Sequence, residues 1–427
     1  MHQFSIKHFT PQQAKEWLIQ SVPRFEQAIF LDSNHHQEKY SRYQWLAALG
    51  AQAILSPTED HFSQLKKFHQ NQKNWLFGHL NYDLKNKLEP TLPSVRKGNF
   101  AFANMCFFVP QMVIYCQNNQ VYVESALHSC QEEFIDYLQS LQEKEESTTR
   151  SVQLTATHNK AHYLNTIQKI KNELQYGHIY ELNYCKEFTG TATSFNPAAT
   201  FRKLNHTAQA PFAAFYRNQN DYLICASPER YVQKQGAHII SQPIKGTAKR
   251  HSNLEEDNRL KAELKSNEKE RSENVMITDL VRNDLSKTAK KGSVTVSELF
   301  GIYSFNSVHQ MISTVNSQLK EDQHFTDVLR STFPMGSMTG APKLKAMQLI
   351  DSFETFARNL FSGAVGYVTP NGDFDFNVVI RSLLYNSKNK EISARVGSAI
   401  TMASQAEKEY EECLLKAENL FRILKND

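Results

Sequence analysis

Strand-like and helix-like segments follow one another in mixed order along this chain of 427 residues. Short apolar runs typical of strands lie at residues 28–31, 75–80, 107–115, 120–123, 179–188, 213–216, 222–226, 239–244, 363–368, 375–385 and 392–396. Helical signals begin at Thr10 and recur over residues 163–174, 252–285 and 404–424. A parallel sheet requires strands that alternate strictly with crossover helices, and these segments do not alternate in that way. The order therefore predicts an α+β fold rich in antiparallel strands.

A polar linker divides the chain. Residues 142–151 read Gln-Glu-Lys-Glu-Glu-Ser-Thr-Thr-Arg-Ser, without a single apolar side chain. Such a run has nothing to bury in a core and is typical of a connection between packed units. The sequence thus predicts an N-terminal region over residues 1–150 and a second domain over residues 151–427.

The composition narrows the class of protein. Charged residues make up 22% and hydrophobic residues 40%, and the net charge of +4 is not gathered into a long basic run, so nothing favours nucleic-acid binding. No stretch approaches the roughly 18 apolar residues of a membrane span, and the N-terminus has no signal-peptide core. The six cysteines are scattered, as is typical of reduced thiols. We therefore expect a cytoplasmic protein that binds neither nucleic acid nor a membrane.

A lysine ends a short apolar strand in the segment Ser241-Gln-Pro-Ile-Lys-Gly-Thr247, where Lys245 stands between Ile244 and Gly246. One interpretation is a structural lysine that covers apolar surface and keeps its ammonium in water. In a dry site, by contrast, the pKa of a lysine falls, and the neutral amine can act as a nucleophile or base. Gly246 would let a ligand approach the backbone closely. The residues alone leave both interpretations open.

Three glutamates lie on or beside the apolar faces of predicted helices. Glu273 shares the core-facing stripe of its helix, where a carboxylate needs a partner. Glu409 and Glu412 are three residues apart and project together at the edge of the apolar stripe of the last helix. One interpretation is a buried ion pair at Glu273 and a surface pair of Glu412 with Lys416. The other is joint ligation of Mg²⁺, since hard oxygen ligands suit that ion.

A glycine-containing loop leads into a helix at residues 333–343. Gly336 and Gly340 leave backbone N–H groups free near the predicted helix N-terminus, which is a natural cradle for a carboxylate or phosphate. A simple capping turn would use the same residues. The sequence does not decide between the two.

Three further side chains have both a structural and a functional interpretation. Glu229 follows a strand, either as an exposed turn carboxylate or as part of a site. His309 follows a strand-like run and is either a hydrogen-bonded core histidine or a ligand contact. Arg381 lies inside the apolar run 378–384, where a buried guanidinium wants an anion from a ligand or from an internal carboxylate. Together with Lys245 and the glutamates, these residues indicate a site for a small polyanion.

Seven motifs taken together resemble the chorismate-utilising enzyme family, which includes anthranilate synthase component I, aminodeoxychorismate synthase component I, isochorismate synthases and salicylate synthases. The motifs lie at residues 243–247, 273–285, 307–311, 336–343, 363–367, 380–383 and 404–412. They run in the family's order over residues 158–424. Residues 30–33 and 78–83 also look like this family's N-terminal region, less specifically.

The resemblance implies a fold like that of anthranilate synthase component I. The expected architecture is α+β, with a large antiparallel-rich β-sheet core, a sandwich of sheets, flanked by helices and with the two halves interwoven. Residues 1–150 would be an N-terminal region of the component I type. Residues 151–427 would be the chorismate-binding catalytic domain.

The resemblance also implies a site. Mg²⁺, held by Glu273, Glu409 and Glu412, would carry the ring carboxylate of chorismate. Lys245 would attack ring carbon 2 as a neutral amine. Glu229 would protonate the departing 4-hydroxyl, which requires a pKa raised by burial. The residues expected to bind the substrate are Asn183, Thr247, His309, Thr339, Gly340, Tyr367, Arg381, Gly397 and Ser398.

Within the family, Lys245 and Asn183 look like the aminodeoxychorismate synthase branch, since anthranilate synthases usually carry alanine at the lysine position. That branch aminates chorismate at carbon 4, on the way to 4-aminobenzoate and folate. No Cys-His-Glu amidotransferase domain is present in the sequence, so ammonia would come from a separate glutamine amidotransferase subunit. The alternatives are the anthranilate synthase branch and a non-catalytic chorismate-binding subunit.

The chain departs from the family pattern at three places. Glu181 replaces the usual glutamine and adds a charge near the expected ring position. Met335 stands where the family often has glycine. Gly397-Ser398-Ala399 replaces a run of glycines, so backbone access to a carboxylate is expected to be tighter.

Overall fold

A computed structural model describes residues 1–6, 8–36, 39–92, 98–140, 151–306 and 308–425. Every strand pair within these residues is antiparallel, and two sheets share the long strand β5 (Met105–Gln117). The first sheet continues through β1 (His2–Ile6), β6 (Gln120–Ser125), β3 (Trp45–Leu55), β2 (Gln27–Asp32), β9 (Phe212–Asn218), β10 (Asp221–Ser227), β19 (Ser382–Asn386), β20 (Glu391–Ile400) and β8 (Glu181–Thr191), with the short strands β7 (Thr155–Ala156) and β16 (Gly340–Ala341) paired to β8. The second sheet contains β4 (Leu76–Leu80), β17 (Ala364–Val368), β18 (Phe374–Val378), β11 (Arg230–Gln235), β12 (His238–Ser241), β13 (Ile244–Lys249), β15 (Val308–Gln318) and β14 (Thr295–Ser304).

Strands from the two ends of the sequence are interwoven. β2 pairs with β9 and β4 pairs with β17, so the first 150 residues complete sheets that the later residues build. The linker expected at residues 142–151 lies, except for its last residue, outside the described residues. The boundary near residue 150 therefore stays a prediction, whereas the interwoven architecture is confirmed.

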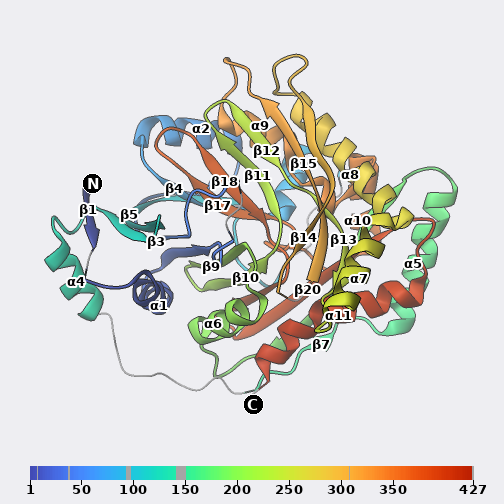
Figure 1. Cartoon of the computed structure of the whole chain (residues 1–427), viewed down its shortest axis with the longest axis horizontal. Coiled ribbons are helices and arrows are strands. Elements are labelled where there is room, and N and C mark those ends of the chain that lie inside the picture. Colours follow the sequence, from blue (N-terminus) through green and yellow to red (C-terminus); the bar gives the residue numbers. More distant parts are fainter. Residues whose placement is uncertain (7, 37–38, 93–97, 141–150, 307, 426–427) are drawn as a thin grey trace.

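Three apolar layers hold the sheets and helices together. One layer, which includes Phe77, Tyr216 and Leu384, lies between the two sheets. A second joins the first sheet to helices that include α11, and a third joins the second sheet to helices that include α8. Figure 1 shows α6 and α11 on one side of the sheets and α2 and α9 on the opposite side. The helices are α1 (Pro11–Ser21), α2 (His61–Gln72), α3 (Lys85–Leu88), α4 (Gln131–Ser140), α5 (Lys160–Gln175), α6 (Pro197–Ala208), α7 (Leu254–Ser266), α8 (Glu268–Ser286), α9 (Phe325–Thr332), α10 (Lys343–Phe353) and α11 (Ala406–Leu424).

Two predicted strands are interrupted in the structure. The run 375–385 is divided into β18 and β19, because Arg381 adopts a left-handed backbone with φ of 53°. The expectation that Arg381 lies inside a strand is therefore wrong. The run 239–244 is divided into β12 and β13 at Gln242-Pro243, since proline has no N–H to donate to a neighbouring strand.

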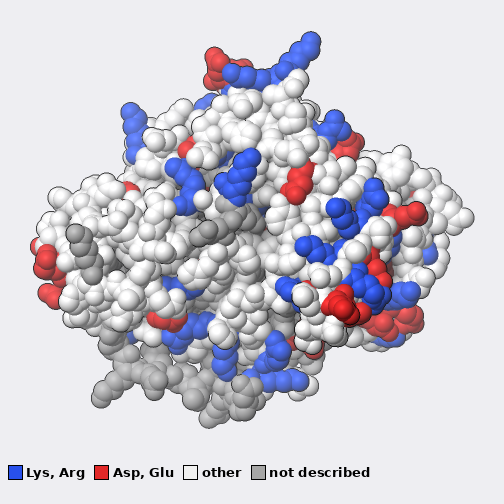
Figure 2. All heavy atoms as spheres, in the orientation of Figure 1, with Lys and Arg blue, Asp and Glu red and all other residues white. Residues whose placement is uncertain are grey.

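The surface and the cysteines agree with the composition. The most densely charged area of the face in Figure 2 mixes acidic and basic side chains, and on α7 Arg259 pairs with both Glu256 and Glu263. All six cysteines are free thiols. Among the helices of the described residues, none has the length and apolar character needed to cross a bilayer.

Candidate functional site

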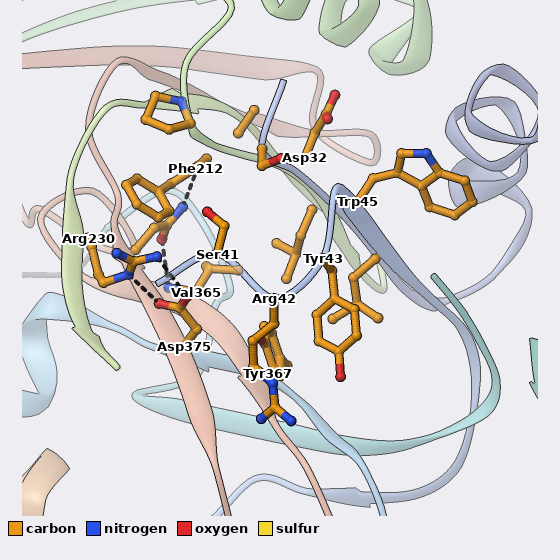
Figure 3. A pocket seen from close by; sticks show the side chains of 16 residues that line it. Asp32, Ser41, Arg42, Tyr43, Trp45, Phe212, Arg230, Val365, Tyr367 and Asp375 are labelled. Atoms are coloured by element: carbon orange, nitrogen blue, oxygen red, sulfur yellow. Dashed lines mark hydrogen bonds and ion pairs between the residues drawn. The ribbon is translucent and has the colours of Figure 1, made fainter. Parts of the chain in front are cut away.

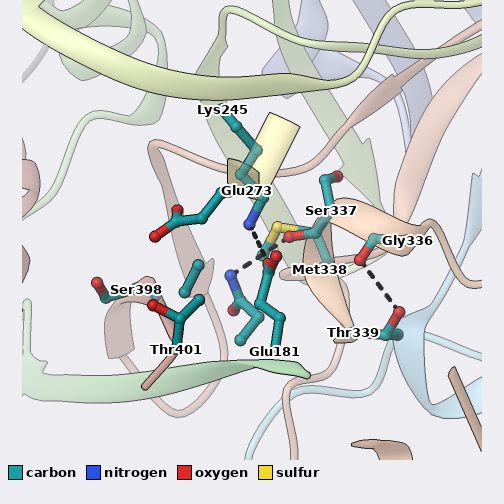
Figure 4. A network of polar contacts seen from close by, with 12 residues as sticks. Glu181, Lys245, Glu273, Gly336, Ser337, Met338, Thr339, Ser398 and Thr401 are labelled. Atoms are coloured by element: carbon teal, nitrogen blue, oxygen red, sulfur yellow. Dashed lines mark hydrogen bonds and ion pairs between the residues drawn. The ribbon is translucent and has the colours of Figure 1, made fainter. Parts of the chain in front are cut away.

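Lys245 lies on a bulge of β13. The pairing of β13 with β15 shifts register between Ile244 and Thr247, and Gly246 takes the left-handed backbone, with φ of 90°, that such a bulge requires. The bulge directs the Lys245 side chain inward, where the residue is only 8% exposed. Its Nζ lies 2.5 Å from Oε1 of Glu181, the first residue of β8 (Figure 4). The structural interpretation with a solvated ammonium is therefore wrong.

The charge on Lys245 is set by three carboxylates. Burial works to lower the pKa of Lys245, but Glu181, Glu273 and Glu229 together outweigh burial and raise the pKa above its ordinary value. Burial alone would favour a neutral amine, whereas the nearby carboxylates favour the ammonium form of Lys245.

Glu229 lies between β10 and β11 and is 4% exposed. Its backbone carbonyl accepts a hydrogen bond from the Val378 amide at 3.0 Å, which fixes the turn. Burial raises the pKa of Glu229 to about 7, although Ser337, Lys245 and the Ile244 amide oppose the rise. A carboxyl group with this pKa is half protonated near neutral pH and can donate a proton. Burial thus raises the pKa of Glu229 as a role in proton donation requires, and the interpretation as an exposed turn carboxylate is wrong.

Two of the three predicted metal ligands, Glu273 on α8 and Glu409 on α11, approach the same lysine. Lys269 places its Nζ 3.2 Å from Oε1 of Glu409 and 3.7 Å from Oε1 of Glu273, so these two carboxylates share one cation. Glu412 forms a separate pair with Lys416, at 2.6 Å. Burial works to raise the pKa of Glu412, but Lys416 and the other nearby cations lower it overall.

The donors of this carboxylate cluster, Glu273, Glu409 and Glu412, fit Mg²⁺ in their chemistry. Glu273 Oε1 is buried and has no hydrogen-bond partner among the described residues, and burial raises the pKa of Glu273 to about 7. An anionic oxygen in that position favours a cation. Within the described ranges, however, no three His, Cys, Asp or Glu side chains lie close enough together to hold a metal ion. Joint ligation of Mg²⁺ by these three glutamates therefore stays a prediction.

Glu270 lies near the carboxylate cluster and was not predicted from the sequence. Burial raises its pKa, and its charge is coupled to Lys269, Glu412 and Lys245. Its Oε2 also lies where a Cβ on Gly246 would come within 3.1 Å of it. The spacing could have revealed it, because Glu270 and Glu273 are three residues apart on α8, as Glu409 and Glu412 are on α11.

The glycine loop packs against the start of β8. Gly340 pairs with Leu182, and its backbone, with φ of 148°, passes so close that a Cβ would lie 2.2 Å from the Glu181 carbonyl. The amide of Asn183 donates to the carbonyl of Thr339 at 2.8 Å. The Thr339 amide donates within the loop, to the carbonyl of Gly336 at 3.1 Å. The loop thus supports β8 beside Glu181, and part of the expected cradle of free N–H groups is already used.

Gly397 and Ser398 of β20 connect this strand to the carboxylate cluster. The Ser398 hydroxyl donates to Oε2 of Glu409, and Lys416 donates to the carbonyl of Gly397 at 2.9 Å. A Cβ at Gly397 would lie 2.6 Å from Oδ1 of Asn183, so the two predicted substrate-binding residues touch. The structure therefore brings Asn183, Gly397 and Ser398 together with the predicted ligands.

Three predicted substrate-binding residues lie around this group rather than within it. His309 is buried and bonded through Nε2 to Oδ1 of Asp257 on α7, at 3.1 Å, so the core interpretation describes it. Thr247 is exposed on β13. Arg381 donates weakly to the Lys416 carbonyl, at 3.4 Å, and burial lowers its pKa against the opposing charge of Glu412. Arg381 thus faces the C-terminal helix near the carboxylate cluster.

Tyr367 lines a different pocket. Its ring packs at 5.9 Å from that of Trp75 and 5.8 Å from that of Tyr43 in the layer between the sheets. Figure 3 shows Tyr367 beside Arg42 and near the ion pair of Arg230 with Asp375, which joins Nε to Oδ1 at 3.1 Å. None of the residues that line this pocket is Lys245 or a predicted metal ligand. Its position therefore gives no support to the prediction that Tyr367 binds the substrate.

This chain is similar in sequence to known proteins over most of its length. A model of the family described as chorismate binding enzyme matches residues 17–422. Aminodeoxychorismate synthase component 1 of Escherichia coli (strain K12) is 29% identical over 441 residues, which cover 97% of this chain and 96% of that protein. Anthranilate synthase component 1 of Bacillus pumilus is 31% identical over 376 residues, which cover 81% of this chain and 72% of that protein.

The fold of this chain is also similar to that of a solved structure. The crystal structure of anthranilate synthase component I from Streptococcus pneumoniae TIGR4 matches with a TM-score of 0.78 at 22% identity, and the match covers 90% of this chain and 93% of that chain. The predicted architecture, α+β with a large antiparallel sheet system like that of anthranilate synthase component I, is confirmed.

Proposed function

This chain belongs to the chorismate-binding enzyme family, and we propose that within the family it is component I of aminodeoxychorismate synthase. In this role it aminates chorismate at carbon 4 to give 4-amino-4-deoxychorismate. The ammonia comes from a separate glutamine amidotransferase subunit. The product leads to 4-aminobenzoate and folate.

One observation carries the proposal: a buried amine faces two buried carboxylates, Glu181 and Glu229, in one site. Lys245 lies 2.5 Å from Glu181, and Glu229 has a pKa raised to about 7 by burial. A protein that merely binds chorismate has no need of a buried nucleophile beside a proton donor. The similarity to the Escherichia coli enzyme over nearly the whole chain agrees with this interpretation.

The proposed reaction assigns one task to each of these side chains. Lys245 Nζ, once neutral, adds to ring carbon 2. The double bond between carbons 1 and 2 then moves to carbons 1 and 6, and the double bond between carbons 5 and 6 moves to carbons 4 and 5. Glu229 gives its proton to the 4-hydroxyl, which leaves as water. Ammonia then adds at carbon 4, the two double bonds return to carbons 1 and 2 and to carbons 5 and 6, and Lys245 is released from carbon 2 as a neutral amine. The proton of the new ammonium group restores Glu229.

Binding of the substrate is assigned to the residues that surround Lys245. Asn183, Thr339, Gly340, Gly397 and Ser398 position the ring and its carboxylates, with Arg381 on the side of α11. Glu273, Glu409 and Glu412 would hold Mg²⁺, and bound Mg²⁺ would neutralise the ring carboxylate and withdraw electrons from the diene. Thr247 on β13 and His309 on β15 stay predictions as substrate contacts.

The location and the partner are parts of the same proposal. Free thiols at all six cysteines suit a reducing compartment, which agrees with a cytoplasmic enzyme. The relative in Escherichia coli is named as component 1, which supports a partner that supplies ammonia.

Anthranilate synthase component I is the second candidate, because the Bacillus pumilus protein is 31% identical over 81% of this chain. The product separates the two. Purified protein is incubated with chorismate, Mg²⁺ and ammonium at pH about 8.5, and the products are identified by mass spectrometry and fluorescence. Aminodeoxychorismate, converted to 4-aminobenzoate by added lyase, is the expected result. Anthranilate with pyruvate would overturn the assignment.

A further inference from the structure

The two carboxylate oxygens of Glu181 have different surroundings. Oε1 accepts a hydrogen bond from Lys245 Nζ at 2.5 Å. Oε2 is buried and has no hydrogen-bond partner among the residues that the structure describes. The residue has no exposed surface, so water does not compensate either oxygen. Burying a carboxylate that accepts only a single hydrogen bond destabilises the folded protein, which indicates a functional role for the residue.

The proposed attack of Lys245 on chorismate requires a group that accepts a proton. An ammonium has no lone pair, so Lys245 must lose a proton before its Nζ can bond to carbon 2. The carboxylates that face Lys245 come from three elements: Glu181 from β8, Glu229 from the turn before β11, and Glu273 from α8. Glu229 must keep its own proton for the 4-hydroxyl. Glu273 is shared with Lys269, and no hydrogen bond joins it to Lys245 within the described residues.

We propose that Glu181 is the proton acceptor of Lys245, and this role rests on the proposed function. Before attack, one proton moves from Nζ to Oε1, which leaves a neutral amine and a neutral carboxylic acid. The Nζ lone pair then forms the bond to carbon 2. After ammonia has displaced it, the released amine takes the proton back from Glu181. The pair returns to ammonium and carboxylate, and no proton is gained or lost.

The surroundings favour this exchange. A proton transfer between two groups 2.5 Å apart needs no movement of either side chain. The transfer removes two charges from a site that excludes water, and burial favours the uncharged forms of both groups. Gly340 pairs with Leu182, and the Asn183 amide donates to the Thr339 carbonyl, so this loop holds the Glu181 backbone in place. A glutamine in the same position could hydrogen-bond to Lys245 but could not accept its proton.

The experiment measures the first half of the reaction without ammonia. The wild-type protein and the Glu181→Gln variant are mixed with chorismate and Mg²⁺, quenched at increasing times, and the mass of the chorismate adduct on Lys245 is followed at pH 6.5 to 9. In the variant we expect the adduct to form about 100-fold more slowly than in the wild type at pH 7. The ratio of variant to wild-type rate should rise with pH, because hydroxide then removes the proton. Comparing the ratio cancels the pH dependence of Glu229, which both proteins share.

Two further variants complete the test. Glu181→Asp keeps a carboxylate one methylene shorter, and its rate should lie between those of the wild type and Glu181→Gln. Glu187→Gln removes another buried carboxylate of the same strand, which pairs with Arg395 at 2.6 Å and not with Lys245, and should leave adduct formation unchanged. The KM for chorismate should be similar in all of these proteins, which shows that each is folded and binds.

The experiment distinguishes failure of the proton-acceptor role from failure of the proposed function. If Glu181→Gln forms the adduct as fast as the wild type, or faster at low pH, the carboxylate only holds Lys245 charged and the proton-acceptor role is wrong. If the wild type forms no adduct, or its product with ammonium is anthranilate, the proposed function itself is wrong.

Discussion

Lys269 of α8 reaches across to α11, and its Nζ lies 3.2 Å from Oε1 of Glu409. The same ammonium is 3.7 Å from Oε1 of Glu273, so an internal cation stands between two proposed Mg²⁺ ligands. A divalent ion that binds these carboxylates must compete with that ammonium for them. Lys269 would therefore weaken binding of the metal.

The first prediction concerns this competition. Lys269→Gln removes the ammonium and should tighten Mg²⁺ binding by about tenfold, because a charge pair of this kind is worth roughly 1 kcal/mol or more. Isothermal titration with MgCl₂ in the absence of chorismate measures the affinity. Lys290→Gln, which removes a surface pair with Glu321 far from the cluster, serves as the control. An unchanged affinity in Lys269→Gln would mean that Lys269 moves away from the carboxylates at no cost.

Lys245→Ala tests the covalent route. Without the amine no bond to carbon 2 forms, and amination at carbon 4 should fall by at least about 1,000-fold, with little change in the KM for chorismate. Lys249→Ala removes an exposed lysine of the same strand and should keep wild-type activity. The measurement is the rate of aminodeoxychorismate formation with ammonium as the nitrogen source. Undiminished amination by Lys245→Ala would show that ammonia attacks chorismate directly.

The sequence predicted the chemistry of the site better than its local backbone. Lys245 and Glu273 were recognised because charged side chains stand out in apolar segments, whereas the role of Glu229 came from the family resemblance. Arg381 was also recognised, but its left-handed backbone was not, since non-glycine residues seldom adopt that conformation. The role of Tyr367 could not be judged from sequence, because the pairing of β17 between β4 and β18 decides which layer its ring enters.

Long-range pairing also explains what the fold prediction lacked. β3 was missed, although it is buried between β2 and β5, because its residues Trp45–Leu55 contain many alanines and little alternation. Glu270 was missed because its charge matters only where α8 meets α11. The pair of Lys245 with Glu181 joins residues 64 positions apart, and no local pattern could place them together.

Because of Glu229, the rate of adduct formation should fall as the pH rises, which gives the pH profile a descending limb. Burial raises its pKa to about 7, so the protonated form that acts as general acid is present below pH 7 and is lost as the pH rises through 7. Glu229→Gln should lower the rate of loss of the 4-hydroxyl by roughly 100-fold or more and remove this limb. The pH dependence of adduct formation at saturating chorismate measures both effects. A limb that persists in the variant would assign the titration to another group.

The raised pKa of Glu229 also has a consequence for stability. The folded protein holds this proton between the ordinary pKa of a glutamate, about 4.5, and the value near 7, whereas the unfolded chain has lost it. The folded state therefore binds more protons in that window, and its stability falls as the pH rises from 4.5 through 7. Glu229→Gln should stabilise the protein by about 3 kcal/mol at pH 8 and hardly at all at pH 4.5. Urea unfolding of both proteins at the two pH values, in EDTA, gives the comparison, and an equal difference at both would contradict the assignment.

The buried pair of Arg358 with Glu354 supports the backbone of the candidate site. Arg358 Nη2 lies 2.6 Å from Glu354 Oε1, and the guanidinium also donates to the carbonyls of Met338 and Asn183 at 2.7 and 2.8 Å. It therefore joins the glycine loop to β8. Arg358→Met leaves the Glu354 carboxylate buried without its partner and should cost about 3–5 kcal/mol of unfolding free energy.

A double variant separates the lost pair from the lost loop contacts. Replacing both charges, as Arg358→Met with Glu354→Leu, should recover much of the stability, because no uncompensated charge then remains in the core. It should not recover activity, since the carbonyls of Met338 and Asn183 still lack their donor and the loop is no longer tied to the strand that carries Glu181. Urea unfolding and adduct formation measured on the same preparations distinguish the two effects. A double variant with both stability and activity restored would show that the guanidinium serves the core alone.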